Sequence, residues 1–279
     1  MKLQLAHISL RYDCLTPSED DSSCVRMNDE GVNGMRMTGH TVLITGGASG
    51  IGFAVAKKLV RMSNKVIIIG RDASKLEAAR RAIPELVAFA CDISVEEQRL
   101  SLAAWLKEEH PELSVLINNA GIQYHARFDQ DPPSLDAIHQ ELEINFVAVV
   151  RLCSLLIPML SLRSEAAIIN LSSGLAIAPK SGAAIYCATK AAVSTFTRSL
   201  RYQLEQSSIH VFDVLPPLVD TDMVRGRGKG KISADAFADQ MIAGVVRGRL
   251  VLHVGKTKLL YYLHRFMPKV AYRIMKHGL

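Results

Sequence analysis

The stretch Thr41-Val-Leu-Ile-Thr-Gly-Gly-Ala-Ser-Gly-Ile-Gly52 decides the fold of this chain. It opens with a short apolar, β-branched run, which is typical of a buried parallel strand. Glycines follow at Gly46, Gly50 and Gly52, and residues 53–60 then take up helical spacing. A strand that turns directly into a helix points unpaired backbone N–H groups out of the helix N-terminus, which favours an anion such as a pyrophosphate. The stretch therefore predicts a dinucleotide-binding turn rather than an ordinary glycine-rich connection.

The same pattern of a strand followed by a helix repeats along the chain. Apolar runs of strand length alternate with segments of helical spacing, and no break in this alternation marks a second domain. The predicted strands are 42–45, 65–70, 86–91, 114–118, 166–171, 209–215 and 250–254, and the predicted helices are 53–60, 73–82, 95–109, 134–160, 185–206 and 234–248. The repeat predicts an α/β fold: a Rossmann-like, doubly wound parallel sheet of about seven strands with helices on both faces.

Length and composition are those of an ordinary globular protein. The chain has 279 residues, of which 49% are hydrophobic and 22% are charged, and this length allows one large domain with an ample core. Its five cysteines are scattered without metal-ligand spacing, so we expect reduced thiols, no metal site and a cytoplasmic location. We find no uninterrupted apolar run of membrane-spanning length and no signal peptide at the N-terminus.

Two terminal segments fall outside the alternation. Residues 1–37 show no sustained periodicity, so we expect a disordered or loosely attached extension. A misassigned start is the alternative, because Met35 and Met37 come just before the first strand. Residues 38–255 then form the dinucleotide-binding catalytic domain. Residues 256–279 predict a basic amphipathic helix, kinked at Pro268, in which the apolar residues Leu259, Leu263, Phe266, Val270 and Ile274 recur at helical spacing.

The net charge of +6 is concentrated near the C-terminus. The stretch 241–279 has eight Lys or Arg residues and no Asp or Glu. A basic amphipathic helix can make peripheral contact with an anionic membrane. The alternative is that its apolar face packs on the domain or on a partner subunit, where it would cover a substrate cleft.

Residues that directly follow the strands are expected to line the ligand site. Gly70 ends the second strand, where an NAD site usually has an acid for the ribose 2′-OH. Arg71 follows it, and because a guanidinium suits a 2′-phosphate we favour NADP(H), while Asp72 leaves NAD(H) open. Asp92, after the third strand, either accepts from the adenine amino group or caps the next helix. Asn118-Asn-Ala120-Gly121 leaves room for a cofactor ribose, although asparagine side chains can also simply brace neighbouring strands.

Tyr186 and Lys190 are the residues most suited to proton transfer. They lie four apart on one face of a predicted helix. A free phenol has a pKa of about 10, which makes it a poor base at neutral pH. An ammonium about 4 Å away would favour the phenolate by about 4 kcal/mol at an effective dielectric constant of about 20, close to the roughly three pKa units required. Such a pair is usually surface decoration, but its place after a strand that ends in Ser172-Ser173 reverses that balance.

At these residues the chain resembles the short-chain dehydrogenase/reductase family, over about 41–254. The turn at 45–52 resembles the family's cofactor loop, and 118–121 resembles its fourth-strand motif. Tyr186 and Lys190 match the family's Tyr-x-x-x-Lys. Ser173 lies thirteen residues before Tyr186, the family's usual spacing, and Asn145 falls where the family has its catalytic asparagine.

The resemblance implies a role for each of these residues. Tyr186 would be the general acid/base, and Ser173 would hold and polarise the substrate carbonyl oxygen. Lys190 would lower the tyrosine pKa and bind the nicotinamide ribose, while Asn145 would support a proton relay through water. The cofactor-binding positions that it implies are Gly46, Ser49, Gly50, Ile51, Gly52, Arg71, Asp92, Asn118, Ala120, Gly121, Tyr186, Lys190, Val219 and Thr221.

One departure from the family pattern concerns the loop after the sixth strand. The family commonly has Pro-Gly there, whereas this chain has Pro216-Pro217, and the second proline fixes φ where a glycine would be free. The path of the loop that leads to Thr221 is therefore open. The run Pro-Pro-Leu-Val-Asp-Thr resembles a bacterial subgroup of the family, whose members often lie near teichoic-acid D-alanylation genes.

These observations predict an NADP-dependent oxidoreductase that interconverts a carbonyl and a secondary alcohol by hydride transfer. We expect a small-molecule substrate and no nucleic-acid partner. The family resemblance further implies a homodimer or homotetramer whose subunits pair through the two long helices. The alternative is a catalytically inactive nucleotide-binding protein of the same fold, with a regulatory or scaffolding role. The intact set Asn145, Ser173, Tyr186 and Lys190 argues against that alternative.

Overall fold

The computed structural model describes residues 34–226, 228 and 230–277. At its centre is a seven-stranded sheet in the order β3-β2-β1-β4-β5-β6-β7, in which every neighbouring pair of strands is parallel. The strand order reverses between β1 and β4, and a crevice at such a reversal is where doubly wound sheets bind ligands. The predicted fold class is confirmed.

The elements lie close to their predicted positions. The strands are β1 (Thr41–Thr45), β2 (Lys65–Gly70), β3 (Val87–Ala90), β4 (Leu113–Asn118), β5 (Ala166–Leu171), β6 (Ile209–Leu215) and β7 (Val251–His253). The α-helices are α1 (Gly50–Arg61), α2 (Ala73–Ala82), α3 (Glu96–Glu109), α4 (Leu135–Leu142), α5 (Ala148–Leu160), α6 (Ala184–Gln203), α7 (Ala234–Val246), α8 (Lys256–Phe266) and α9 (Pro268–Met275). Short 3-10 turns, η2 (Gly174–Ala176) and η3 (Asp222–Val224), follow β5 and β6. The long helix predicted over 134–160 is interrupted by a π-helical turn, η1 (Glu143–Val147).

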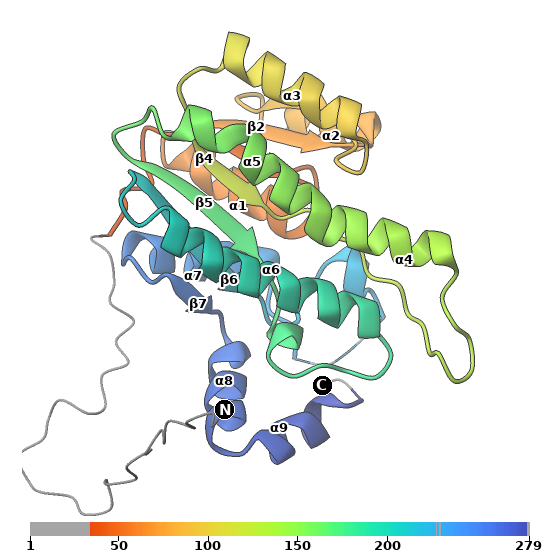
Figure 1. Cartoon of the computed structure of the whole chain (residues 1–279). Helices are drawn as coiled ribbons and strands as arrows, with labels where there is room; N and C mark the ends of the chain where they lie inside the picture. Colours follow the sequence, from red (N-terminus) through yellow and green to blue (C-terminus); the bar gives the residue numbers. More distant parts are fainter. Residues whose placement is uncertain (1–33, 227, 229, 278–279) are drawn as a thin grey trace, which may run out of the picture.

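Alternate residues of each strand face opposite helical layers. In β1, Val42 and Ile44 join the apolar cluster beneath α1 and α7, whereas Leu43 joins the cluster beneath α3, α5 and α6. This division follows from the two-residue period of a strand. Figure 1 shows α5 and α6 in front of the sheet and α1 and α7 behind it. Because both faces are covered, the strands are continuously apolar.

The packed part of the chain begins earlier than predicted. Residues 1–33 of the predicted extension lie outside the described residues. Met35 and Met37, however, are each 1% exposed and belong to the cluster beneath α1 and α7. The predicted end of the extension at residue 37 is therefore wrong, because these two side chains fill the core next to β1.

The segment Leu135–Leu160, which joins α4, η1 and α5, is long and apolar enough to cross a membrane by length and composition alone. The sequence pattern did not single it out, because Arg151 and Pro158 interrupt the apolar run. In the fold α5 packs on β4 and β5 and buries Leu152, Leu156 and Leu160. Its composition is that of a helix with one face in the core and a second apolar face outside it.

The C-terminal segment forms two helices instead of one kinked helix. α8 ends at Phe266 and α9 begins at Pro268. Their inner side contributes Leu260, Ala271 and Met275 to a third apolar cluster, in which Leu263 is partly buried. The predicted apolar face is therefore not the packing face, because its members Leu259, Phe266, Val270 and Ile274 are exposed.

Candidate active site

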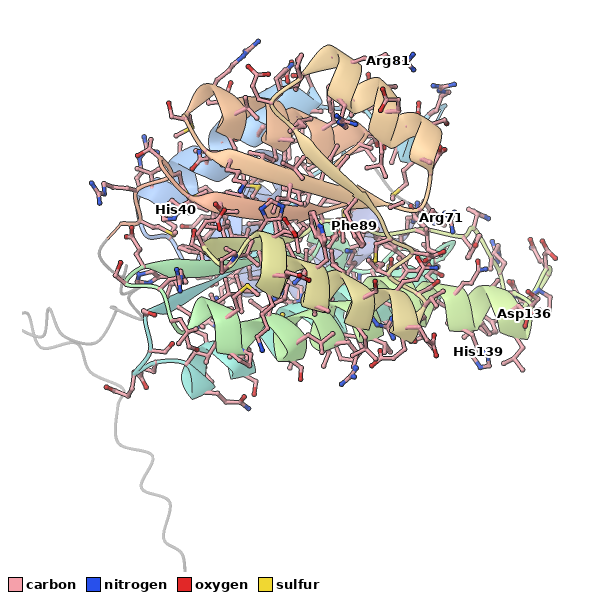
Figure 2. The ribbon with its side chains drawn as sticks, turned by 90° about the horizontal axis from the view of Figure 1, so that it is seen from above. His40, Arg71, Arg81, Phe89, Asp136 and His139 are labelled. Atoms are coloured by element: carbon pink, nitrogen blue, oxygen red, sulfur yellow. The ribbon has the colours of Figure 1, made fainter. Side chains whose placement is uncertain are left out.

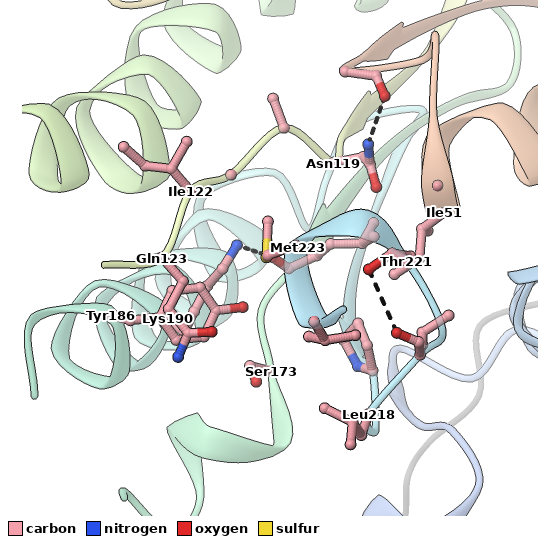
Figure 3. A pocket seen from close by; sticks show the side chains of 18 of the residues that line it. Ile51, Asn119, Ile122, Gln123, Ser173, Tyr186, Lys190, Leu218, Thr221 and Met223 are labelled. Atoms are coloured by element: carbon pink, nitrogen blue, oxygen red, sulfur yellow. Dashed lines mark hydrogen bonds between the residues drawn. The ribbon is translucent and has the colours of Figure 1, made fainter. Parts of the chain in front are cut away.

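A cavity of about 740 Å³ opens at the carboxyl ends of the strands, a volume typical of small-molecule and cofactor sites. Figure 3 shows Tyr186 and Lys190 side by side in this cavity, with Ser173 nearby and Ile51 and Thr221 on another wall. Most predicted site residues line it: Gly46, Ser49, Gly50, Ile51, Arg71, Asp92, Ala120, Gly121, Ser173, Tyr186, Lys190, Val219 and Thr221. Gly52, Asn118 and Asn145 are not among the lining residues.

The turn after β1 presents an uncapped helix N-terminus to the cavity. Gly50 begins α1 with φ at +53°, a conformation that strains residues with a Cβ. Within the described residues, Ser49 makes no side-chain capping bond and the first turn of α1 has no acid. Its backbone N–H groups can therefore donate to an anion, as a pyrophosphate requires. Gly52 lies beneath the turn, where a Cβ would meet the oxygen of Gly46 at 2.3 Å, so its role is close packing.

At the end of β2, Gly70 stands where an NAD site usually has an acid, and two cations and Asp72 follow it along the cavity wall. Arg71 is exposed at this end (Figure 2), and Lys75, in the first turn of α2, lines the cavity with it. Asp72 caps α2: its Oδ1 accepts from Ser74 Oγ at 2.6 Å and from the Lys75 backbone N–H at 3.1 Å. These hydrogen bonds lower the pKa of Asp72. Sequence reasoning missed Lys75, although its position four residues after Arg71 was visible.

Asp92 lies in the turn after β3 and lines the cavity. Its Oδ1 accepts from the backbone N–H of Ser94 at 2.9 Å and from Ser94 Oγ at 2.7 Å. The N-cap residue of α3 is Val95, so the expectation that Asp92 caps this helix is wrong. The carboxylate instead fixes the turn that forms one wall of the site.

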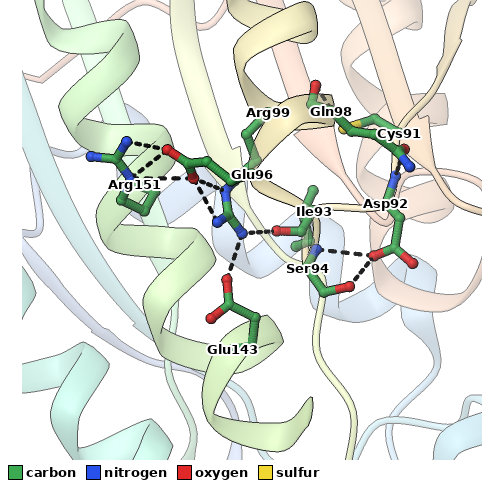
Figure 4. Close-up of polar contacts among 9 residues, drawn as sticks. All are labelled: Cys91, Asp92, Ile93, Ser94, Glu96, Gln98, Arg99, Glu143 and Arg151. Carbon is green, nitrogen blue, oxygen red and sulfur yellow. Dashed lines mark hydrogen bonds and ion pairs between the residues drawn. The ribbon is translucent and has the colours of Figure 1, made fainter. Parts of the chain in front are cut away.

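Arg99 joins that turn to the π-helical segment (Figure 4). Its buried guanidinium donates to the oxygen of Ile93, and at 2.6 Å to Glu143 Oε1. It also donates to Glu96 Oε2 at 2.6 Å, and Arg151 pairs with the same carboxylate. Hydrogen bonds from Arg151 and Arg99 lower the pKa of Glu96 to about 2. Sequence reasoning did not find this network, because its members lie on three separate elements.

Lys190 is buried next to Tyr186. Its Nζ lies 5.8 Å from the centre of the Tyr186 ring and donates to the backbone oxygen of Leu171 at 2.8 Å. Burial lowers the pKa of Lys190 to about 8, and the negative charge of Asp213 acts in the opposite direction. The fold thus holds the Lys190 ammonium in a site of low polarity, close to the Tyr186 phenol.

The two serines at the end of β5 point to different partners. Ser172 Oγ donates to the buried carboxylate of Asp213, whereas Ser173 lines the cavity with Tyr186. Ser173 Oγ accepts from the backbone N–H of Leu175 at 3.1 Å. Because the oxygen accepts that bond, its O–H group can donate to an oxygen of a ligand.

Asn145 and Asn118 are held within the fold. Asn145 is fully buried in η1, where its Oδ1 accepts from the Ile122 N–H at 2.8 Å and its Nδ2 donates to Thr189 Oγ1 at 3.2 Å. Thr189 Oγ1 donates in turn to the Tyr186 backbone oxygen at 2.8 Å, so the Asn145 side chain positions the tyrosine helix. Asn118 Nδ2 donates to Asn170 Oδ1 at 2.8 Å, which matches the strand-bracing alternative.

The loop with the double proline still places Thr221 in the cavity. A Cβ on Gly50 would lie 3.1 Å from Thr221 Cγ2, so the two residues face each other across the turn. Val219, on the same loop, forms a parallel bridge with Ile232. Pro217 therefore does not carry the loop away from the site.

Comparison with known proteins identifies the family. A family profile described as short chain dehydrogenase matches residues 40–231 of this chain. The chain belongs to the short-chain dehydrogenase/reductase family. This membership confirms the predicted class of enzyme, an NAD(P)-dependent oxidoreductase.

Individual members of the short-chain dehydrogenase/reductase family match most of the chain. The uncharacterized oxidoreductase DltE of Bacillus subtilis (strain 168) is 39% identical over 221 residues, which cover 77% of this chain and 88% of that protein. A short-chain dehydrogenase from Sphingobium yanoikuyae, solved with NADPH, is 28% identical with a TM-score of 0.72, over 83% of this chain and 95% of its own. One from Burkholderia cenocepacia J2315, solved with NADP, shares the fold with a TM-score of 0.77 at 24% identity, over 86% of this chain and 98% of its own.

Proposed function

We propose that this protein is an NADP(H)-dependent oxidoreductase that interconverts a carbonyl compound and a secondary alcohol, with Tyr186 as the general acid/base. The observation that carries the proposal is the meeting of Ser173, Tyr186 and Lys190 in one cavity with the uncapped N-terminus of α1. An anion-binding turn and a proton-transfer group at the same strand ends are what a nicotinamide-dependent reaction needs.

In the direction of reduction, the Ser173 hydroxyl donates a hydrogen bond to the substrate carbonyl oxygen, which polarises the carbon–oxygen bond. Tyr186 delivers a proton to that oxygen as negative charge develops on it. The buried ammonium of Lys190 stabilises the resulting tyrosinate, since opposite charges attract strongly in a site of low polarity. The nicotinamide, when bound, supplies the hydride. In the direction of oxidation, the same tyrosinate removes the hydroxyl proton.

The preference for NADP(H) rests on Arg71 and Lys75. Both line the cavity at the end of β2, where a ribose 2′-phosphate would be the anion to bind. Asp72, the residue that left NAD(H) open, accepts two hydrogen bonds at the start of α2, and this use as a cap supports NADP(H). The NADPH bound by the relative from Sphingobium yanoikuyae agrees with this choice.

The test is consumption of the reduced cofactor with a panel of ketones and aldehydes, run in parallel with NADPH and NADH. We expect steady turnover with at least one carbonyl compound and a higher kcat/KM for NADPH. The alternative function, a regulatory or scaffolding protein that has lost catalysis, predicts tight NADPH binding with no turnover on any member of the panel. A preference for NADH would contradict the cofactor assignment alone.

We also propose that the protein is a homodimer or homotetramer, paired through α4–α5 and α6. Leu135, Leu142 and Val147 are exposed on the first of these segments, whose other face lies in the core, so the exposed face can be covered by a second subunit. Light scattering at micromolar concentration should give a multiple of the 30.6 kDa chain mass. A monomer mass would contradict this proposal.

We further propose a cytoplasmic location. The buried free thiols Cys91, Cys153 and Cys187 support it, because free thiols are typical of a reducing compartment.

A further inference from the structure

The outer face of the C-terminal helix pair carries apolar side chains that the fold leaves in water. Leu259 is 71% exposed and Phe266 is 76% exposed, and Met267, Val270 and Ile274 are exposed as well. Single exposed apolar residues scattered over a surface are ordinary, whereas a cluster of them marks an interaction surface. Figure 1 shows α8 and α9 projecting from the body of the domain beyond β7.

The exposed residues form one stripe on each helix. At about 100° per residue, Leu259, Tyr262 and Phe266 fall on one side of α8, away from the buried Thr257 and Leu260. The same rotation places Val270 next to Ile274 on α9, apart from the buried Ala271 and Met275. We call these residues, together with Met267 between the helices, the outer stripe: Leu259, Tyr262, Phe266, Met267, Val270 and Ile274.

Cations flank the outer stripe on both helices. Lys258 and Arg265 lie beside it on α8, and Arg273 lies beside it on α9, by the same helical rotation. Lys269 lies at the start of α9 and, with Arg273, lines a groove against α6. All four side chains are exposed or partly exposed. The whole stretch 241–279 has no Asp or Glu, so the face is positive without compensation from its own segment. A protein partner of mixed charge would not need this arrangement, whereas an anionic lipid surface matches it.

We propose that α8 and α9 dock this protein on an anionic bilayer, with the outer stripe inserted among the lipids and Lys258, Arg265 and Arg273 at the phosphate level. An amphipathic helix with an apolar face and Lys and Arg beside it lies in the interface plane. Apolar burial and attraction to anionic lipids then add. The inner side of the pair keeps a separate task, since Leu260 and Met275 line the catalytic cavity. Docking would thus bring the cavity within about one helix diameter, roughly 10 Å, of the lipid surface.

The first test is sedimentation of the full chain with vesicles of phosphatidylcholine alone or with added phosphatidylserine, at low salt. We expect binding that requires phosphatidylserine and decreases with salt. Replacing Lys258 and Arg265 with Gln should weaken the partition coefficient by about fivefold for each charge removed. The control pair Arg80→Gln and Arg81→Gln, on exposed positions of α2, should leave it within twofold or so.

The second test removes the outer stripe. The double variant Leu259→Ser and Phe266→Ser should lower the partition coefficient by more than about tenfold, because two large apolar side chains no longer enter the lipid. The matched control changes two exposed leucines elsewhere, Leu100→Ser and Leu162→Ser, of which Leu162 is 74% exposed, and should bind like the original chain. Since neither serine pair touches the core, both variants are expected to unfold at the original temperature.

Three results would overturn the proposal. The chain could remain in the supernatant with phosphatidylserine vesicles, or the outer-stripe variant could sediment as well as the original chain. Light scattering could also give a smaller assembly for the outer-stripe variant than for the original chain, which would mean that a second copy covers the face. All three readouts are independent of catalysis, so failure of the proposed reaction would leave this test unaffected.

Discussion

The two ends of the cavity are built in different ways. At the catalytic end, Lys190 is buried and hydrogen-bonded to Leu171, and the Tyr186 helix is tied to η1 through Thr189 and Asn145. At the phosphate end, formed by Arg71, Asp72 and Lys75, all three residues are exposed. The residues of the catalytic end are held in place by packing, whereas those of the phosphate end are charged side chains in contact with solvent.

The difference separates chemistry from cofactor choice. A buried cation acts strongly on its neighbour because the medium screens little, so changes at the catalytic end should act on the rate. Exposed charges interact weakly and are screened by salt, so changes at the phosphate end should act on affinity, by small factors. The predictions below test this separation, beginning with the largest effect.

Replacing Tyr186 with Phe should remove the proton donor without disturbing the packing of α6. We expect kcat to decrease by about 10²-fold to 10⁴-fold. The NADPH dissociation constant should change by only a small factor, because in the proposed mechanism the phenol transfers a proton and the turn after β1 holds the pyrophosphate. Steady-state kinetics and NADPH titration measure the two quantities. Tyr202→Phe, at an exposed position on α6, is the control and should change neither. A Tyr186→Phe protein that keeps a near-normal rate would contradict the proposed mechanism.

The fold, and the meeting of Ser173, Tyr186 and Lys190 in one cavity, were predictable because each has a local signal. The run at 41–52 combines a buried strand, glycines and a helix in twelve consecutive residues, and Tyr186 and Lys190 share a helix face by spacing alone. Ser173 could be chosen over Ser172 only through the family's spacing, and the structure gives the physical basis: Ser172 is bound to Asp213.

What sequence could not predict depends on contacts between distant elements. A π-helical turn places Asn145 against Ile122 and Thr189. The apolar pattern of the sequence does not distinguish this turn from the α-helix around it. The packing of Met35 and Met37 depends on α1 and α7, which lie elsewhere in the chain. The apolar period of α8 and α9 was visible, but which side meets the domain was not, because Leu260 and Leu259 are equally apolar and only one of them is buried.

The buried charge of Lys190 should be measurable without any substrate. Because the folded-state pKa is about 8 against an ordinary 10.5, the unfolded chain binds more protons between these values. The free energy of unfolding should therefore rise with pH across this window, by up to about 3 kcal/mol. Urea unfolding from pH 7 to pH 10.5 measures it. Lys190→Met should lack this rise, whereas Lys107→Met, at an exposed position of α3, should keep it. An identical pH dependence in both variants would refute the assignment.

At the phosphate end, Arg71→Ala should weaken NADPH by about tenfold at low salt, since a hydrogen bond to a charged group contributes about 1.5–3 kcal/mol before screening. The affinity for NADH should change far less, because NADH has no 2′-phosphate. Lys75→Ala should show the same selectivity with a smaller effect. Equal losses for both cofactors would mean that Arg71 has only a structural role. Dissociation constants at two salt concentrations would also show whether this end is screened as its exposure predicts.

The smallest expected effect concerns Asp213, whose charge raises the pKa of Lys190 against the effect of burial. Because the proposed mechanism requires the Lys190 ammonium, kcat/KM should decrease tenfold per pH unit above the pKa of about 8 in the free enzyme. Asp213→Asn removes the negative charge, so the pKa of Lys190 should decrease further. The alkaline limb of the plot of kcat/KM against pH should then move to lower pH, by less than burial itself has moved it.

The Asp213 carboxylate also accepts hydrogen bonds from Ser172 and Ser194, so the effect of lost hydrogen bonding must be separated from the effect of lost charge. Ser194→Ala removes one of these bonds and keeps the charge, and should leave the limb in place. A limb that stays fixed in Asp213→Asn, or moves equally in Ser194→Ala, would show that it does not report the charge on Lys190.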